Sequence, residues 1–363
     1  MRLADLLPVF ERIAPLRYAE SWDNVGLIAG DPESAIDHIL LTIDCTRSVL
    51  NEAASVGANL IFAYHPPLFE GIKNVRAGSL VYQAIRQNMA LYSPHTALDV
   101  AEGGTNDLLA DVAGLGARRP LKRIDGKDSA FKLVTFVPES NVENVAKAVF
   151  EAGGGNIGNY TECSFQQVGT GTFRGGEGSN PVIGAPGQLE KVNEVRFETL
   201  VLHERKDAVI KALLAAHPYE EPAFDLLRLV PLASHVGIGR VGEYAKPVAI
   251  TNIIERLKKG LSVSALLVAG DIENSVTRIA MCAGAGRGLL NDALAQKAQL
   301  FITGELPHHD ALRAAAAGMT VICALHSNSE RATLQRVAEK LKTMAPNVRV
   351  SVSTEDRDPY QVV

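Results

Sequence analysis

The sequence predicts an α/β protein whose core comes in two separated halves of largely parallel strands, with an inserted α+β unit between them. Three observations support this fold class. Short apolar segments alternate with helical segments in the first third of the chain, and the same alternation returns in the last third. The middle third instead has the two-residue periodicity of antiparallel strands.

The first third opens with apolar residues at helical spacing from Leu3 to Ile13, and the helix ends before Pro15. Asp5 and Glu11 interrupt its apolar positions, so we expect an ordinary amphipathic helix rather than a signal peptide. Buried strands are then expected at 39–43, 60–63 and 90–92, with helices over 47–56 and 79–87.

The last third repeats this order. Strands are expected at 266–269, 279–282, 300–303 and 321–324, with helices near 289–297 and 309–317. A final helix has Leu334, Val337 and Leu341 on one apolar face and is stopped by Pro346.

The middle third is expected to form a separate unit. A strand at 133–137, a helix at 142–152, paired strands within 160–202, a helix at 207–216 and a strand at 224–229 give a β-α-β-β-α-β order. That order is ferredoxin-like. The predicted division is therefore 1–126 for the first half of the core, 127–231 for the insertion and 232–363 for the second half.

Composition narrows the class of protein. The chain has 36 basic and 41 acidic residues, a net charge of −5, so binding to nucleic acid is disfavoured. Four scattered cysteines form no metal knuckle and suit a reducing compartment. Because no stretch is long and apolar enough to span a bilayer, we expect a cytoplasmic protein without membrane contacts.

Five histidines fall at or just beyond predicted strand ends: His65, His95, His308, His309 and His326. Ligands of open α/β sheets bind outside the carboxyl ends of strands, so these loops can converge on one crevice. Asp99, Glu305 and Glu330 each lie three or four residues from one of these histidines. Imidazole with carboxylate is a ligand set for zinc, manganese or iron(II).

Each local motif also has a purely structural interpretation. Glu330 suits the first turn of the last helix as well as it suits a metal. His65 precedes two prolines and could belong to a simple turn, and Asp99 could cap one. Adjacent residues on a helix point about 100° apart, so at most one of His308 and His309 faces a given site.

Two further segments remain open between a binding role and a turn. Gly284-Ala285-Gly286-Arg287-Gly288 could cradle a phosphate, although a tight turn is the simpler interpretation. Asp23 and Asn24 could line a pocket or hold a turn.

Four motifs in this order resemble one family: Trp22-Asp23-Asn24-Val25-Gly26-Leu27, His65-Pro66-Pro67-Leu68-Phe69, His95-Thr96-Ala97-Leu98-Asp99 and His326-Ser327-Asn328-Ser329-Glu330-Arg331. Gly304-Glu305 followed by His309-Asp310 completes the pattern. The chain resembles the Ngg-one-interacting factor three-like family, also labelled GTP cyclohydrolase type 2 homologues, over 1–125 and 233–363. Ala216 to Pro222 resembles part of the PII-like insertion of longer members.

The resemblance implies a two-lobed core with a dinuclear metal site in its cleft, and a toroidal homo-hexamer whose insertions cover the ring openings. The matching ligands are His65, Asp99, His326 and Glu330, with Glu330 bridging two metals. Tyr64 stands where many bacterial members have a further histidine, and a neutral phenol is a poorer ligand than imidazole. Tyr64 and His95 are therefore weaker candidates, and one or two divalent metals per chain are expected.

The leading functional hypothesis is a metal-dependent hydrolase acting on a small nucleotide-like or phosphorylated substrate. Glu330 would hold the metals, and His309 or Glu305 would transfer protons. The alternative is a metal-binding regulatory or chaperone-like assembly without catalysis.

Overall fold

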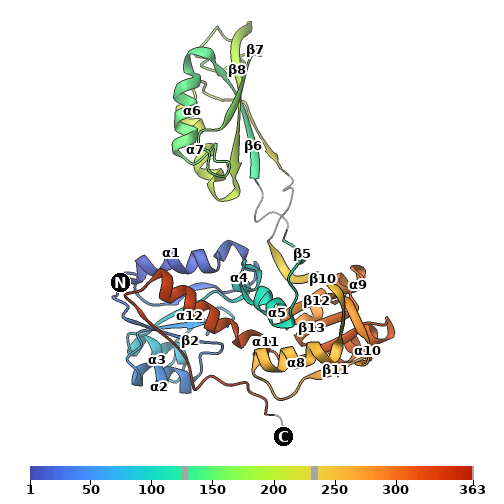
Figure 1. The fold of residues 1–363 in the computed structure, drawn as a ribbon. Helices are drawn as coiled ribbons and strands as arrows, with labels where there is room; N and C mark the ends of the chain where they lie inside the picture. The colour runs from blue at the N-terminus through green and yellow to red at the C-terminus, as the bar shows by residue number, and fades with distance from the viewer. Residues whose placement is uncertain (125–129, 230–235, 362–363) are drawn as a thin grey trace. The chain divides into compact units, whose positions relative to one another are not determined.

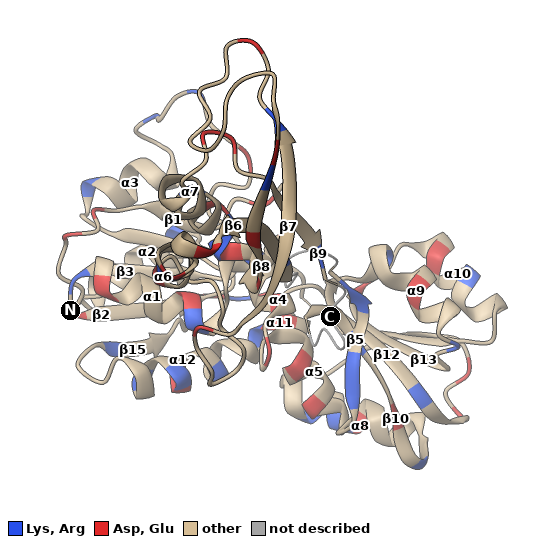
Figure 2. Ribbon diagram, turned by 90° about the horizontal axis from the view of Figure 1, so that it is seen from above, with Lys and Arg blue, Asp and Glu red and all other residues tan. Residues whose placement is uncertain are grey.

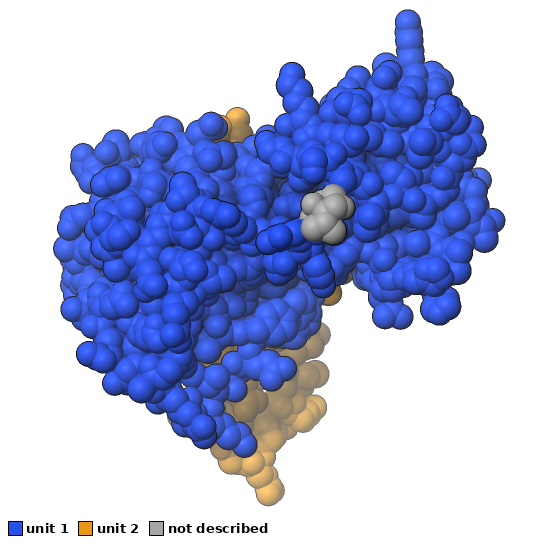
Figure 3. All heavy atoms as spheres, turned by 90° about the horizontal axis from the view of Figure 1, so that it is seen from below, with its two compact units in different colours: residues 1–124, 235–363 blue, residues 125–234 orange. Residues whose placement is uncertain are grey.

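The computed structural model describes residues 1–124, 130–229 and 236–361. The chain divides into two compact units: a core unit, Met1–Ile124 with His235–Val363, and an inserted unit, Asp125–Ser234 (Figures 1 and 3). The division predicted at 126/127 and 231/232 falls at residues outside the described ones. Within the described parts, no helix combines the length and the apolar character that crossing a membrane requires.

The first lobe of the core unit is a five-stranded sheet in the order β1-β4-β3-β2-β15. All neighbouring strands are parallel except β1 and β4. The strands are β1 (Gly26–Ala29), β2 (His38–Thr42), β3 (Leu60–Ala63), β4 (Ala90–Ser93) and β15 (Arg349–Val352).

Every residue of β2, β3 and β4 is buried because helices cover both faces of this sheet. Leu41 and Phe62 face a cluster shared with α1 (Leu3–Ile13) and α12 (Thr333–Met344), and Leu40 and Ile61 face one shared with α2 (Arg47–Ser55) and α3 (Leu80–Arg86). The strand β15 and the helix α12 come from the end of the chain, so the last segment completes the first lobe (Figure 1).

The second lobe is a six-stranded sheet in the order β11-β14-β13-β12-β10-β5. Its strands are β5 (Arg118–Arg123), β10 (Gly237–Ala249), β11 (Leu267–Ala269), β12 (Ser275–Ala285), β13 (Leu300–Glu305) and β14 (Thr320–Cys323). β12, β13 and β14 run parallel, whereas β5, β10 and β11 each pair antiparallel, so this sheet is mixed rather than mostly parallel. The edge strand β5 carries a run of basic residues (Figure 2).

Helices also cover both faces of the second sheet. α5 (Thr105–Ala113) and α8 (Ile250–Leu261) pack on one face, and α9 (Leu290–Ala295) and α10 (His308–Ala316) on the other. Two short helices, α4 (His95–Val100) and α11 (Asn328–Arg331), begin near the site described below. Single 3₁₀ turns occupy Leu16–Tyr18, Glu139–Asn141, His203–Arg205 and Gly286–Leu289.

A buried ion pair joins the halves of the core that flank the insertion. Asp107 on α5 accepts two hydrogen bonds from Arg240 on β10, Oδ1 from Nε at 2.7 Å and Oδ2 from Nη2 at 2.9 Å. Arg118 Nε and the Gly103 N–H also donate to this carboxylate, each at 2.8 Å. The pair therefore links a residue that precedes the insertion to one that follows it.

The inserted unit is a four-stranded antiparallel sheet in the order β7-β8-β6-β9. Its elements are β6 (Ala130–Pro138), α6 (Val142–Glu151), β7 (Ser164–Arg174), β8 (Leu189–Leu202), α7 (Lys206–Ala216) and β9 (Phe224–Arg228), which is the β-α-β-β-α-β order expected from the sequence. Both helices cover one face of the sheet, where Leu133, Val195 and Phe197 are buried.

Candidate metal site

Three polar side chains follow the parallel strands of the first lobe at the same offset. Asp44, His65 and His95 each stand two residues beyond the end of β2, β3 and β4, respectively. Because these strands are parallel neighbours, their carboxyl ends share one edge of the sheet and the side chains gather there.

The second lobe supplies the other side of the site. β14 ends at Cys323, and after a short turn His326 precedes α11, whose Glu330 is only 3% exposed. Gly284, at the end of β12, has φ +65°, and a Cβ there would lie 2.5 Å from Glu330 Oε1. Gly284 therefore allows the backbone to pass close to the Glu330 carboxylate. This favours the interpretation of residues 284–288 as a tight turn over that as a phosphate-binding loop.

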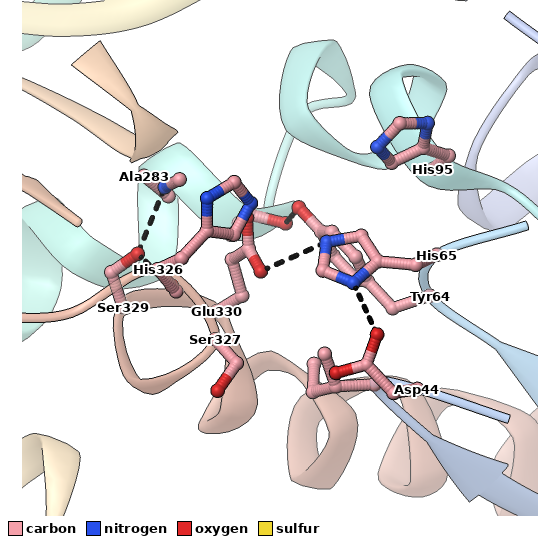
Figure 4. Close-up of polar contacts among 12 residues, drawn as sticks. Asp44, Tyr64, His65, His95, Ala283, His326, Ser327, Ser329 and Glu330 are labelled. Atoms are coloured by element: carbon pink, nitrogen blue, oxygen red, sulfur yellow. Dashed lines mark hydrogen bonds and ion pairs between the residues drawn. The ribbon is translucent and has the colours of Figure 1, made fainter. Parts of the chain in front are cut away.

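His65, His326 and Glu330 form a group whose ligand atoms all lie within 4.8 Å of one another. His65 Nε2 is 3.3 Å from Glu330 Oε2, and His326 Nε2 is 3.4 Å from Glu330 Oε1 (Figure 4). Ligands bound at about 2.0–2.1 Å in a tetrahedron stand roughly 3.3–3.4 Å apart. These two distances, each to a different oxygen of Glu330, are therefore compatible with a transition metal bound here.

The polar atoms at the centre of this group are left without hydrogen bonds. His65 Nε2 and Glu330 Oε2 are buried, and within the described chain neither makes a hydrogen bond of normal geometry. Their 3.3 Å contact is an ion pair without hydrogen-bond geometry, so both atoms keep unused hydrogen-bonding capacity in a buried place, which is rare. A cation would satisfy both, so the residues present fit a divalent metal.

Carboxylates orient both imidazoles from behind. His65 Nδ1 lies 2.9 Å from Asp44 Oδ1, and His326 Nδ1 lies 3.0 Å from Glu305 Oε1. Such contacts fix the ring and, in metal sites, direct the opposite nitrogen to the ion; here that nitrogen faces Glu330. Burial alone would lower the pKa of His65, but the hydrogen bond to Asp44 and the charge of Glu330 outweigh it and raise the pKa to about 10.

Tyr64 and Asp99 interact with each other beside this group. The Tyr64 hydroxyl donates to Asp99 Oδ1 and lies 2.9 Å from Thr105 Oγ1. Burial and the nearby Asp99 carboxylate raise the pKa of Tyr64 well above its ordinary value, so the phenol stays neutral and is a poor ligand. Burial and the charge of Glu330 raise the pKa of Asp99 to about 7.

The remaining predicted residues are distributed as follows. His95 stands beside His65, with ring centroids 5.4 Å apart, and its Nδ1 is held by Asp23 at 2.7 Å. Among the described residues of the site, Glu305 contacts His326. His309 is exposed in the first turn of α10 and contacts the His308 ring; among the described residues it makes no contact with the three candidate ligands.

Two residues of the site have no counterpart in the sequence prediction, namely Asp44 and Thr105. Asp44 is recognisable in principle, because it follows β2, the strand next to the one that His65 follows. Thr105 comes from the start of α5, and no short-range pattern marks it.

Comparison with known proteins identifies the family of the chain. A family model described as Duf34/NIF3 (NGG1p interacting factor 3) matches residues 1–359. The chain belongs to this family. A Mycobacterium tuberculosis relative named "GTP cyclohydrolase 1 type 2 homolog" is 38% identical over 370 residues, which cover 100% of this chain and 97% of the relative.

Solved structures resemble this chain over its whole length. A Bacillus cereus protein related to NIF3 is 33% identical with a TM-score of 0.78, covering 100% of this chain and 99% of the other. A Staphylococcus aureus protein is 29% identical with a TM-score of 0.81 and the same coverage. The predicted α/β fold class and the family resemblance are confirmed.

Proposed function

We propose that this Duf34/NIF3 member is a metal-dependent hydrolase acting on a small nucleotide-like or phosphorylated substrate. The observation that carries the proposal is the pair of imidazole nitrogens directed at the two oxygens of the buried Glu330 carboxylate. A divalent cation held there, whether zinc, manganese or iron(II), would act as a Lewis acid and would make hydroxide available as a nucleophile at neutral pH.

The protein's own side chains have distinct roles in this proposal. His65, His326 and Glu330 hold the cation. Asp44 and Glu305 keep the two imidazoles oriented, so Glu305 acts as a positioning residue rather than as a proton donor. His309 has no contact that supports proton transfer at this site within the described chain, and His309→Ala is expected to keep turnover.

We propose one metal per chain rather than two. Asp99, the fourth ligand implied by the resemblance, is engaged by the Tyr64 hydroxyl, and Tyr64 itself is neutral. A second metal held by Asp99 would therefore have to displace the contact between Asp99 and Tyr64.

Elemental analysis combined with one substitution tests this site. Protein reconstituted with zinc, manganese or iron and then desalted should retain about one equivalent per chain. Glu330→Ala should lose both the metal and turnover on a panel of nucleotides and phosphoesters. Glu243→Ala, which removes an exposed carboxylate from the same unit, should change neither. Turnover by metal-free Glu330→Ala would contradict the mechanism.

A non-catalytic regulatory or chaperone-like assembly is the second candidate. The observation favouring it is a groove of about 820 Å³ in the inserted unit, lined among others by Phe136, Arg174, Arg196 and Tyr219. Grooves of this size hold small molecules. We propose a homo-hexamer in either case. Light scattering with and without metal tests the assembly, and robust metal-dependent turnover would count against the non-catalytic alternative.

A further inference from the structure

Two large aromatic side chains are exposed together on the core unit. Trp22, the only tryptophan of the chain, is 59% exposed, and Phe69 is 57% exposed. Their ring centroids lie 5.6 Å apart with the planes tilted by 41°. We call this pair the aromatic platform. Two exposed rings of this size do not contribute the hydrophobic free energy that their burial would give. Such rings are therefore candidates for contact with a ligand.

Both rings of the platform are held in place by their neighbours in the sequence. Asp23, whose side chain is fully buried, accepts hydrogen bonds from His95 Nδ1 at 2.7 Å and from the backbone N–H and hydroxyl of Thr96. Asn24 Nδ2 donates to the carbonyl of Leu68 at 2.7 Å, directly before Phe69. Asp23 and Asn24 therefore hold a turn, and that turn fixes the platform in advance of any ligand.

The platform stands beside the candidate metal site. The ring centroids of Trp22 and Phe69 each lie 6.1 Å from that of His95, and His95 lies 5.4 Å from His65. Figure 4 shows His95 beyond His65 as seen from His326. Because Asp23 occupies Nδ1 of His95, Nε2 is the nitrogen that can meet a ligand resting on the platform.

We propose that the aromatic platform binds the planar nitrogen heterocycle of the substrate by stacking, and that the rest of the substrate extends past His95 to the metal ligands. This inference rests on the proposed function and specifies its substrate class. Any nucleobase can stack on an aromatic side chain, because every base has a π face.

Tryptophan fluorescence reads the platform directly, because Trp22 is the only source of the signal. Metal-reconstituted protein would be titrated with guanosine, adenosine and cytidine monophosphates. Ribose 5-phosphate serves as the matched probe that lacks the ring. Saturable quenching by at least one nucleotide, with none by ribose 5-phosphate, is expected. Equal quenching by ribose 5-phosphate, or no quenching by any nucleotide, would overturn the proposal.

Substitutions separate stacking from metal binding. Phe69→Leu keeps an apolar side chain but removes the ring, and the apparent Kd should rise roughly tenfold. Phe165→Leu removes a 60% exposed phenylalanine of the inserted unit and should leave the Kd unchanged. Glu330→Ala should lose the metal and retain the quenching. An unchanged Kd in Phe69→Leu refutes the platform alone, whereas turnover by metal-free Glu330→Ala refutes the hydrolase mechanism alone.

Discussion

Replacing Asp107 by asparagine should destabilise the core unit in a pH-dependent way. The Asp107 side chain is 9% exposed and its partner Arg240 is 4% exposed. Burial opposes ionisation of Asp107, but the hydrogen bonds and charge of Arg240 outweigh it, with help from Gly103 and Arg118, and lower the pKa from 3.8 to about 2. At 1.36 kcal/mol per unit, ionisation of Asp107 contributes about 2.5 kcal/mol to the free energy of unfolding at neutral pH.

The sign of the pH dependence follows from the lowered pKa. The contribution is complete above the unfolded-state pKa near 4 and is lost as the pH falls through the folded-state value near 2. Asp107→Asn also leaves a buried guanidinium without its counter-charge, so the total loss at about pH 7 should reach roughly 3–5 kcal/mol. The difference between the two proteins should shrink between about pH 4 and pH 2.

Urea unfolding followed by circular dichroism at a series of pH values measures this difference. Glu243→Gln is the matched control, because the Glu243–Arg278 ion pair is exposed and worth less than about 1 kcal/mol. A destabilisation that is the same at about pH 3 as at about pH 7, or a control that costs as much, would refute the reasoning.

Two other predictions concern the metal ligands. Gly284→Ala places a Cβ against Glu330 Oε1, at a backbone φ that disfavours alanine. Metal retention measured by elemental analysis should therefore fall, and the free energy of unfolding should decrease by about 1–2 kcal/mol. Unchanged metal content would contradict the proposed position of Glu330. Asp44→Asn removes the negative charge that contacts His65 Nδ1. Zinc affinity, measured by competition with a chromogenic chelator, should therefore fall roughly 10- to 100-fold. An unchanged affinity would mean that Asp44 does not orient the ring.

The sequence predicts most of the site because its residues follow short buried strands. The ends of β3 and β4 are visible as apolar segments followed by a histidine, and parallel pairing brings His65 and His95 to one edge. The same logic applies to His326 beyond β14. These placements depend on strand ends, which the sequence marks clearly.

Other features depend on contacts between distant segments, which local patterns do not encode. The sequence places His308 and His309 at the start of a helix just beyond a strand, as α10 confirms, but it does not decide whether either faces the site; both are exposed. Tyr64 looks like a substituted ligand, and only the packing shows that its hydroxyl is bound to Asp99. The antiparallel strands β5 and β10 of the second sheet flank the insertion and lack the continuous apolar segment by which the central strands are recognised.

The candidate metal ligands come from both halves of the core, which lie on either side of the insertion in the sequence. His65 comes from the half before the insertion, and His326 and Glu330 come from the half after it. The second half also returns to the first lobe, where β15 pairs with β2 and α12 packs on the same sheet. The Asp107–Arg240 pair joins the halves again on the side of the second sheet. Neither lobe is therefore complete without both halves, and the three candidate ligands come together only when the core has closed around them.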